Sequence, residues 1–232
     1  MLKSLILVNL ISLKNYNMHY TKHDLIKLNR IKRLNIVNSL SGIKSANLIG
    51  TISKIGQTNL SIVSSVIHIG SNPALIGFMM RPESEVRRHT FENIIESSKF
   101  TINQVSTDMI DKAHYTSAKF DSSESEFAHC HLSEEYINEH KAPFVSESTL
   151  KIGMSLEEVV QMKSTDCKLI IGSIDHLFLP EEYINKEGYL DLMGMNTSGI
   201  GGLNTYYSLS EIGKFPYARV DEAKRLFPLH AK

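Results

Sequence analysis

The sequence predicts a mainly β domain whose strands pair antiparallel, with a few short helices around them. Residues 46–53, 58–69 and 74–80 are rich in β-branched and apolar side chains and follow one another through short turns. Parallel pairing would need crossover connections of about a dozen residues or more, and these turns are too short to hold them. An antiparallel sheet of this kind can close into a barrel, which removes its edges.

Length and composition describe an ordinary globular chain. It has 232 residues, of which 42% are apolar and 22% charged, and its 25 Lys and Arg balance 25 Asp and Glu. This balance leaves no overall field to recruit nucleic acid or anionic lipid. Cys130 and Cys167 form no CxxC motif, which excludes a zinc-finger framework and a disulfide-rich scaffold. We therefore expect a reducing, cytoplasmic location.

Residues 1–17 are expected to form an N-terminal extension to a single domain spanning 18–232. The apolar run Leu5–Leu13 lacks a small-residue cleavage site after it and is shorter than the roughly 20 residues that cross a bilayer. Met18 is a better beginning, because Thr21–Asp24 reads as a capping box. The extension is thus either a mis-assigned start or a weak targeting or anchoring segment, and we expect no membrane association of the domain.

A first helix is expected after this capping box. Apolar residues recur at helical spacing from Leu25 to Leu40, and Gly42 supplies a stop. Its polar positions carry five basic residues: Lys22, Lys27, Arg30, Lys32 and Arg33. They could contact a nucleic acid, but no aromatic residues are interleaved with them, and a solvated helix face is the simpler interpretation. We expect no nucleic-acid partner.

The rest of the chain continues with strands and short helices. Further strands are expected at 99–105, 143–145, 150–162 and 168–179. Helices are expected at 90–97, capped by Thr90, from Ser106 or Thr107 to His114, and as a short turn at 180–182. Residues 81–85 and 121–126 read as loops. No repeat or change of composition marks a second domain.

Several common catalytic motifs are missing from the sequence. It contains no GxGxxG, GxxxxGK[ST], HExxH or GxSxG, so Rossmann, P-loop, zincin and hydrolase sites have no support. The triplet His129-Cys130-His131 is an improbable metal site, because consecutive residues of an extended chain point to opposite faces. We expect no bound metal.

One group of residues is suited to binding a phosphate monoester. Hydroxyl and amide side chains lie on or beside one strand, and basic residues lie where a helix begins. The strand contributes Asn59, Ser61, Ser64 and Ser65, and the loop contributes Arg81, Arg87, Arg88, His89 and Thr90. A solvent-exposed basic loop is an equally good interpretation of the pattern alone.

The same segments resemble the flavin reductase-like family of the FMN-binding split barrel. The resemblance covers about residues 18–220, in order, and leaves 1–17 outside. It rests on residues 46–51, 56–65, 70–78, 88–94, 100–103, 113–120, 126–127, 142–144, 201–202 and 206–207. One departure is Ile55-Gly56-Gln57 where many relatives have Asp-Gly, although Gly56 still permits the turn.

This resemblance implies an antiparallel Greek-key split barrel with short peripheral helices, usually a homodimer with bound FMN. The strand matching 59–65 and the loop matching 81–90 would hold the flavin, with its phosphate among the hydroxyl and basic groups. Backbone N–H groups near Ser65 and Val66 would hydrogen-bond the isoalloxazine edge. His114, Lys119 and Tyr206 are candidates for lining the substrate pocket, and no residue is assigned as an acid or base.

The implied activity is NAD(P)H-dependent reduction of flavin, in which hydride passes from nicotinamide to the flavin. The alternative is an FMN-binding electron carrier without strong NAD(P)H activity. An oxygenase or another redox protein could be the partner. The sequence does not decide between FMN and FAD, between NADH and NADPH, or between a retained and a released flavin.

Overall fold

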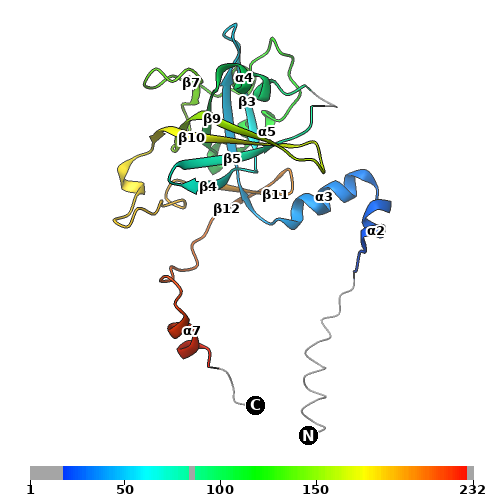
Figure 1. Cartoon of the computed structure of the whole chain (residues 1–232). Coiled ribbons are helices and arrows are strands. Elements are labelled where there is room, and N and C mark those ends of the chain that lie inside the picture. Colours follow the sequence, from blue (N-terminus) through cyan, green and yellow to red (C-terminus); the bar gives the residue numbers. More distant parts are fainter. Residues whose placement is uncertain (1–17, 84–86, 229–232) are drawn as a thin grey trace.

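The computed structural model describes residues 18–83 and 87–228 and contains one large antiparallel sheet (Figure 1). Its seven strands follow the order β3-β2-β6-β9-β10-β5-β4. They are β2 (Asn47–Ile52), β3 (Thr58–Val63), β4 (Ile67–Ser71), β5 (Ala74–Met80), β6 (Lys99–Gln104), β9 (Lys151–Gln161) and β10 (Lys168–Phe178). Every strand pair in these ranges is antiparallel, which confirms the predicted topology.

The connection between β3 and β4 shows that this sheet closes into a barrel. These strands are the two outermost of the sheet, yet only Ser64, Ser65 and Val66 join them. Laid flat, seven strands would place their edges about 29 Å apart, at about 4.8 Å per step. From Val63 to Ile67 the chain reaches at most about 14 Å. The sheet therefore curls until its edges meet, and we call residues 64–66 the seam.

Smaller elements surround the barrel. One short sheet has the order β1 (Lys44–Ser45), β11 (Ser198–Gly201), β12 (Thr205–Ser208), and another pairs β7 (Glu134–Glu135) with β8 (Phe144–Val145). The helices near the barrel are α4 (His89–Ser97), η1 (Thr107–Met109), α5 (Ile110–Tyr115), α6 (Glu126–His129) and η2 (Glu181–Tyr183). Their short lengths agree with the predicted peripheral helices.

Two apolar clusters form the core, one on each face of β2. Leu48 joins a cluster with Leu60 and with residues of α5 and α6. The next residue, Ile49, joins Phe78 and Phe100 in a second cluster that draws on five strands and α4. Neighbouring residues of a strand point to opposite faces, so β2 is buried on both sides.

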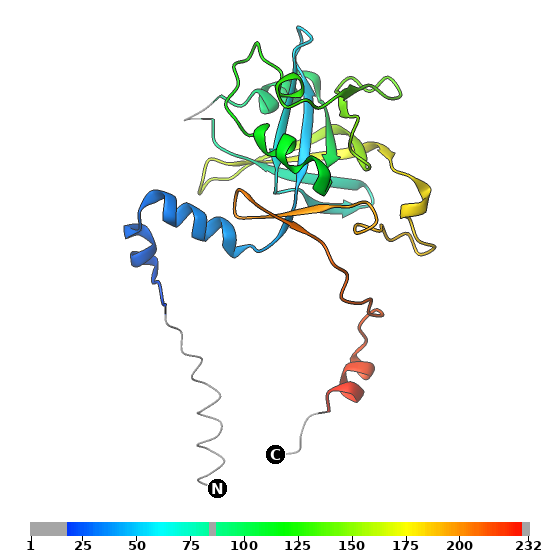
Figure 2. The ribbon, with the colours of Figure 1, turned by 180° about the vertical axis from the view of Figure 1, so that it is seen from behind.

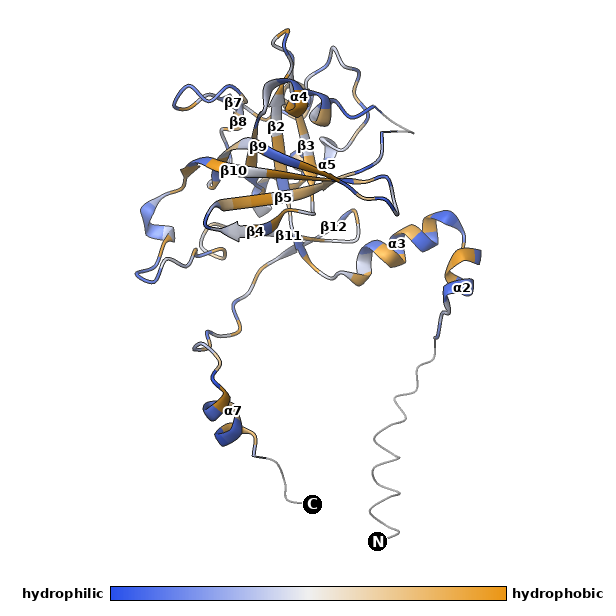
Figure 3. Cartoon of the chain, viewed as in Figure 1, coloured by the Kyte–Doolittle hydropathy of each residue, from blue (hydrophilic) through white to orange (hydrophobic). Residues whose placement is uncertain are grey.

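The two ends of the described chain project away from the barrel. Figures 1 and 2 show α2 (Lys22–Lys27), α3 (Arg30–Leu40) and the C-terminal segment with α7 (Val220–Leu226) extending from it. Figure 3 shows apolar and polar residues mixed along these helices. Among the described residues, no helix is long and apolar enough to cross a membrane.

Some expected elements differ in the structure. The helix from Leu25 to Leu40 is two helices, because Asn29 caps α3 with its side chain, whereas the Thr21–Asp24 capping box is present. The expected strand 58–69 is two strands broken at the seam. Thr90 does not cap α4: the helix begins at His89 after Arg88. Strands β11 and β12 and helix α7 were not predicted. Residues 1–17 and 84–86 lie outside the described ranges.

Candidate functional site

Two adjoining cavities lie beside the outer edge of β3. The first has a volume of about 350 Å³ and the second of about 530 Å³. Both are within the range of about 300–1,000 Å³ typical of small-molecule sites. They share the lining residues Ser61, Arg88, Thr90 and Ser117, so they form one continuous groove. We call them the polar end and the seam end of the groove.

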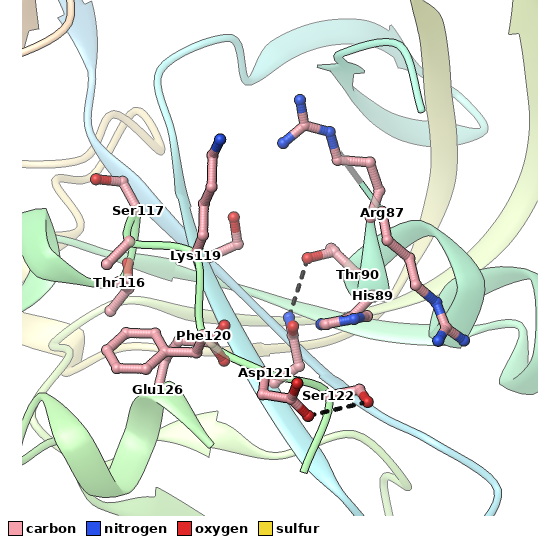
Figure 4. Close-up of a pocket in the computed structure, with 14 residues that line it drawn as sticks. Arg87, His89, Thr90, Thr116, Ser117, Lys119, Phe120, Asp121, Ser122 and Glu126 are labelled. Atoms are coloured by element: carbon pink, nitrogen blue, oxygen red, sulfur yellow. Dashed lines mark hydrogen bonds between the residues drawn. The ribbon is translucent and has the colours of Figure 1, made fainter. Parts of the chain in front are cut away.

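The polar end is lined from two sides. Figure 4 shows side chains of α4 and the loop before it facing side chains of residues 116–126. The predicted residues found here are Asn59, Ser61, Arg87, Arg88, His89, Thr90 and Lys119. The other lining residues are Thr116, Ser117, Ala118, Phe120, Asp121, Ser122 and Glu126. This end therefore combines hydroxyl groups with cationic groups.

The seam end has apolar walls with polar groups between them. Six predicted residues besides Thr90 line it: Ser61, Ser64, Ser65, Arg81, Arg88 and His114. Its apolar walls come from Ile62, Val63, Met79, Met80, Ile200 and Leu203, and two amides, Asn38 and Asn204, complete it. Such walls suit a flat aromatic ring system, and the few polar groups can orient it.

Two predicted site residues line neither cavity. Val66 is half-buried and packs against the barrel core. Tyr206 is half-buried on β12 and packs against the other core cluster, with its hydroxyl 3.0 Å from His114 Nδ1. The structure thus gathers eleven of the thirteen predicted residues around one groove and leaves these two side chains outside its lining.

Thr90 is held in place by β3. Asn59 Nδ2 donates a hydrogen bond to Thr90 Oγ1 at 3.0 Å, and both residues are buried (dashed line in Figure 4). One turn further along α4, Asn93 Nδ2 donates to Thr51 Oγ1 at 3.1 Å. These bonds tie the helix to the edge strand β3 and to its neighbour β2. As a result, the start of α4 has a fixed position at the polar end.

The start of α4 favours an anion. Arg88 is its N-cap residue and makes no side-chain cap hydrogen bond, and among the described residues no carboxylate or hydroxyl is recorded on the N–H groups of His89 and Thr90. Phe91 and Glu92 donate their N–H groups to Arg88 O. The N–H groups of His89 and Thr90 precede these first intrahelical hydrogen bonds. Free N–H groups at a helix N-terminus, with the helix dipole behind them, attract phosphate.

The two neighbouring arginines have different surroundings. Arg87 Nε donates to Glu92 Oε1 at 2.7 Å, and this bond lowers the pKa of the Glu92 carboxyl. The Arg87 side chain is 67% exposed, so its cation is largely engaged at the surface. Arg88 is half-buried, lines both ends of the groove, and donates from Nε to Pro82 O at 3.4 Å. Arg88 is therefore the better placed of the two for a bound phosphate.

Side chains from the 116–126 segment accept backbone N–H groups along the unpaired edge of β3. Glu126 Oε2 accepts the Leu60 N–H at 2.9 Å, and Thr116 Oγ1 accepts the Ile62 N–H at 3.0 Å. Outward N–H groups recur every second residue along an edge strand, so Ser64 is the next position in this row. Within the described chain no hydrogen bond is recorded for the Ser64 N–H. The row thus ends with a donor beside the groove.

Two carboxyl groups at the polar end are already engaged. Burial raises the pKa of Glu126, and its carboxyl is held by the Leu60 N–H. Asp121 accepts hydrogen bonds from the Ser123 backbone and hydroxyl, which lower its pKa. Sequence reasoning missed both residues as site residues, together with Thr116. The pair Glu126-Phe127 was quoted only as a family landmark, and its contact with β3 spans 66 residues.

The barrel and its groove define a split-barrel protein of the flavin reductase type. The chain belongs to the flavin reductase-like family, because the family model described as "Flavin reductase like domain" matches residues 41–195. This confirms the predicted family and the split-barrel fold. No curated protein sequence matches the chain significantly.

Solved structures agree with this assignment. A candidate flavin reductase with a split barrel domain from Shewanella frigidimarina NCIMB 400 is 42% identical, with a TM-score of 0.83 over 87% of this chain and 100% of that chain. Nitrilotriacetate monooxygenase component B from Bacillus cereus is 18% identical, with a TM-score of 0.76 over 85% and 98%. An FMN-binding protein from Thermus thermophilus is 15% identical, with a TM-score of 0.61 over 75% and 90%. The last two show the shared fold alone.

Proposed function

We propose that this protein binds FMN in the groove and reduces flavin with NADH or NADPH. The single observation that carries the proposal is the shape and chemistry of the groove. Its polar end gathers Arg88, Thr90 and the start of α4, and its seam end has apolar walls beside the Ser64 N–H, which has no recorded partner among the described residues. A phosphate monoester at the first end and an isoalloxazine ring at the second would satisfy both sets of groups.

The residues present fit FMN in charge as well as in shape. Arg88 and the first N–H groups of α4 would hold the phosphate through charge-assisted hydrogen bonds. Glu126 opposes the phosphate less strongly than a free carboxylate would, because burial raises its pKa and so favours the uncharged form. Asp121 is exposed, so water and salt screen its charge. The hydroxyls of Ser61 and Ser117 line both cavities and would reach the ribityl chain between them.

Bound FMN would supply the redox chemistry, accepting a hydride from C4 of the nicotinamide at its N5 atom. The protein would fix the position of the two reactants and exclude water. Backbone donors at the seam, with Ser64 first among them, would stabilise negative charge at the edge of the ring. This division of work requires no catalytic acid or base from the chain.

Two comparisons bear on what happens to the electrons. A monooxygenase component B shares the fold, which supports an oxygenase as the partner that receives reduced flavin. A flavoredoxin from Desulfovibrio vulgaris shares it too, at 20% identity and a TM-score of 0.66, which supports the alternative of an FMN-binding electron carrier. A homodimer also remains part of the proposal, since the family resemblance implies it.

The visible spectrum of the purified protein tests this function. We expect a yellow protein, or one that becomes yellow and retains FMN after gel filtration, whose absorbance near 450 nm bleaches on anaerobic addition of NADH or NADPH. Colour without bleaching by either nucleotide would favour the electron carrier. Failure to bind FMN or FAD would exclude both functions. Analytical ultracentrifugation of the same sample reports the oligomeric state.

A further inference from the structure

A histidine and a tyrosine from separate elements form a pair beside the seam end. His114 is the fifth residue of α5, and Tyr206 is the second residue of β12. Tyr206 OH lies 3.0 Å from His114 Nδ1, and the rings meet edge to face with centroids 5.7 Å apart. His114 lines the cavity, whereas Tyr206 is outside its lining and packs against a core cluster.

The direction of the hydrogen bond between Tyr206 and His114 decides which nitrogen of the imidazole carries the proton. The hydrogen bond to Nδ1 is the one bond of the phenol in the described chain, and burial raises the pKa of Tyr206, so the phenol keeps its proton. A phenol that donates to Nδ1 leaves the proton of a neutral imidazole on Nε2. No bond to Nε2 is recorded among residues 18–83 and 87–228. With the phenol as donor, this nitrogen offers an N–H to a molecule in the groove.

The seam end has two walls, and His114 belongs to the second. One wall comes from the seam and the adjoining ends of β3 and β5, residues 62–65 and 79–81. The other comes from α3, from α5 and the turn after it, and from the β11–β12 hairpin: Asn38, His114, Ser117, Ile200, Leu203 and Asn204. A ring held by the first wall leaves the second wall to the molecule stacked on it.

We propose that His114 donates its Nε2–H to a carbonyl oxygen of the molecule that exchanges hydride with the flavin, and that Tyr206 is the positioning residue that holds His114 in this state. In a nicotinamide nucleotide the acceptor is the carboxamide oxygen. The inference rests on the proposed function. It assigns recognition of the second reactant to residues from α5 and β12, apart from the residues that hold the FMN phosphate.

Three variants test the pair: His114→Leu, His114→Gln and Tyr206→Phe. Stopped-flow reduction of the FMN-loaded protein gives the nucleotide affinity and the hydride-transfer rate separately. We expect H114L to weaken nucleotide binding about 2- to 12-fold, the range for one neutral hydrogen bond, while FMN affinity changes less than twofold. H114Q keeps an N–H donor and recovers most of the affinity. H68L is the matched control, since His68 lies on β4 outside both cavities.

Nuclear magnetic resonance of ¹⁵N-labelled histidine in the same protein reports the tautomer directly. We expect the Nε2–H form of His114 in the wild type and a mixture of tautomers in Y206F. Unchanged nucleotide affinity in H114L, an equal loss of FMN affinity, or an Nδ1–H tautomer in the wild type would each overturn the inference. If the wild-type protein binds FMN but neither nucleotide reduces it, the proposed function and this inference are both overturned. If a nucleotide reduces the wild-type protein and H114L keeps the same nucleotide affinity, only the inference is refuted.

Discussion

The hydroxyl of Ser65 bridges both backbone groups of Met79. Met79 N donates to Ser65 Oγ at 3.1 Å, and Ser65 Oγ donates to Met79 O at 3.3 Å. Ser65 belongs to the seam and Met79 to β5, which lies next to the edge strand β4. A single side chain thus takes the place of backbone hydrogen bonds between strands where the two edges of the sheet meet. Both residues also line the groove.

We expect Ser65→Ala to destabilise the protein by about 1–3 kcal/mol, because the N–H and C=O of half-buried Met79 both lose their partner. Urea unfolding followed by circular dichroism measures this change. Ser208→Ala is the control, since Ser208 is exposed on β12 and makes no side-chain hydrogen bond in the described structure. Equal midpoints for both variants would show that the hydroxyl does not hold the seam.

Arg88→Ala should weaken FMN binding far more than Arg87→Ala. Removing one charge-assisted hydrogen bond costs about 1.5–3 kcal/mol, or roughly 10- to 150-fold in the dissociation constant. Arg87 is committed to Glu92 at the surface, so we expect its loss to change the constant less than threefold. Fluorescence titration of the apoprotein with FMN compares the two variants. If Arg87→Ala weakened FMN binding more than Arg88→Ala, the phosphate would have to bind at Arg87 instead.

Glu126→Gln should become more stable relative to the wild type as pH rises. Burial raises the pKa of Glu126, so between its unfolded value, about 4.5, and the raised value the folded state binds more protons than the unfolded state. The wild type therefore loses stability across this window, and the glutamine variant does not. The amide oxygen can still accept the Leu60 N–H.

Urea midpoints of both proteins at pH values from 4 to 8 check the sign of this effect. We expect the difference between E126Q and wild type to move in favour of E126Q with increasing pH and to level off above the raised pKa. A difference that is constant over the whole series would mean that Glu126 titrates alike in the folded and unfolded states.

Gly50→Ala should disrupt the middle of β2. A Cβ atom at Gly50 would overlap the carbonyl oxygen of Pro143 and lie 2.5 Å from Thr101 Oγ1, and the former is backbone that cannot rotate away. We expect a loss of about 1–3 kcal/mol or more, as for other overpacked cores. Gly213→Ala is the control, because its Cβ would meet nothing closer than 3.8 Å. Thermal unfolding of both variants measures the contrast.

Local pattern in the sequence was enough for most strands and for the family. Alternating and β-branched runs predicted β2, β5, β6, β9 and β10, because these features arise from neighbours a few residues apart. The same local chemistry placed Asn59, Arg88 and Thr90 in the candidate site, and all three line one groove. The resemblance to the flavin reductase-like family was confirmed over residues 41–195.

Only the tertiary structure decided how these parts meet. The break at the seam, the engagement of Arg87 by Glu92, the contact of Tyr206 with His114 and the contact of Glu126 with β3 could not be read from spacing along the chain. The last two contacts join residues 92 and 66 positions apart. Periodicity records which face of an element is buried, whereas the partner across a curled sheet depends on where its edges close.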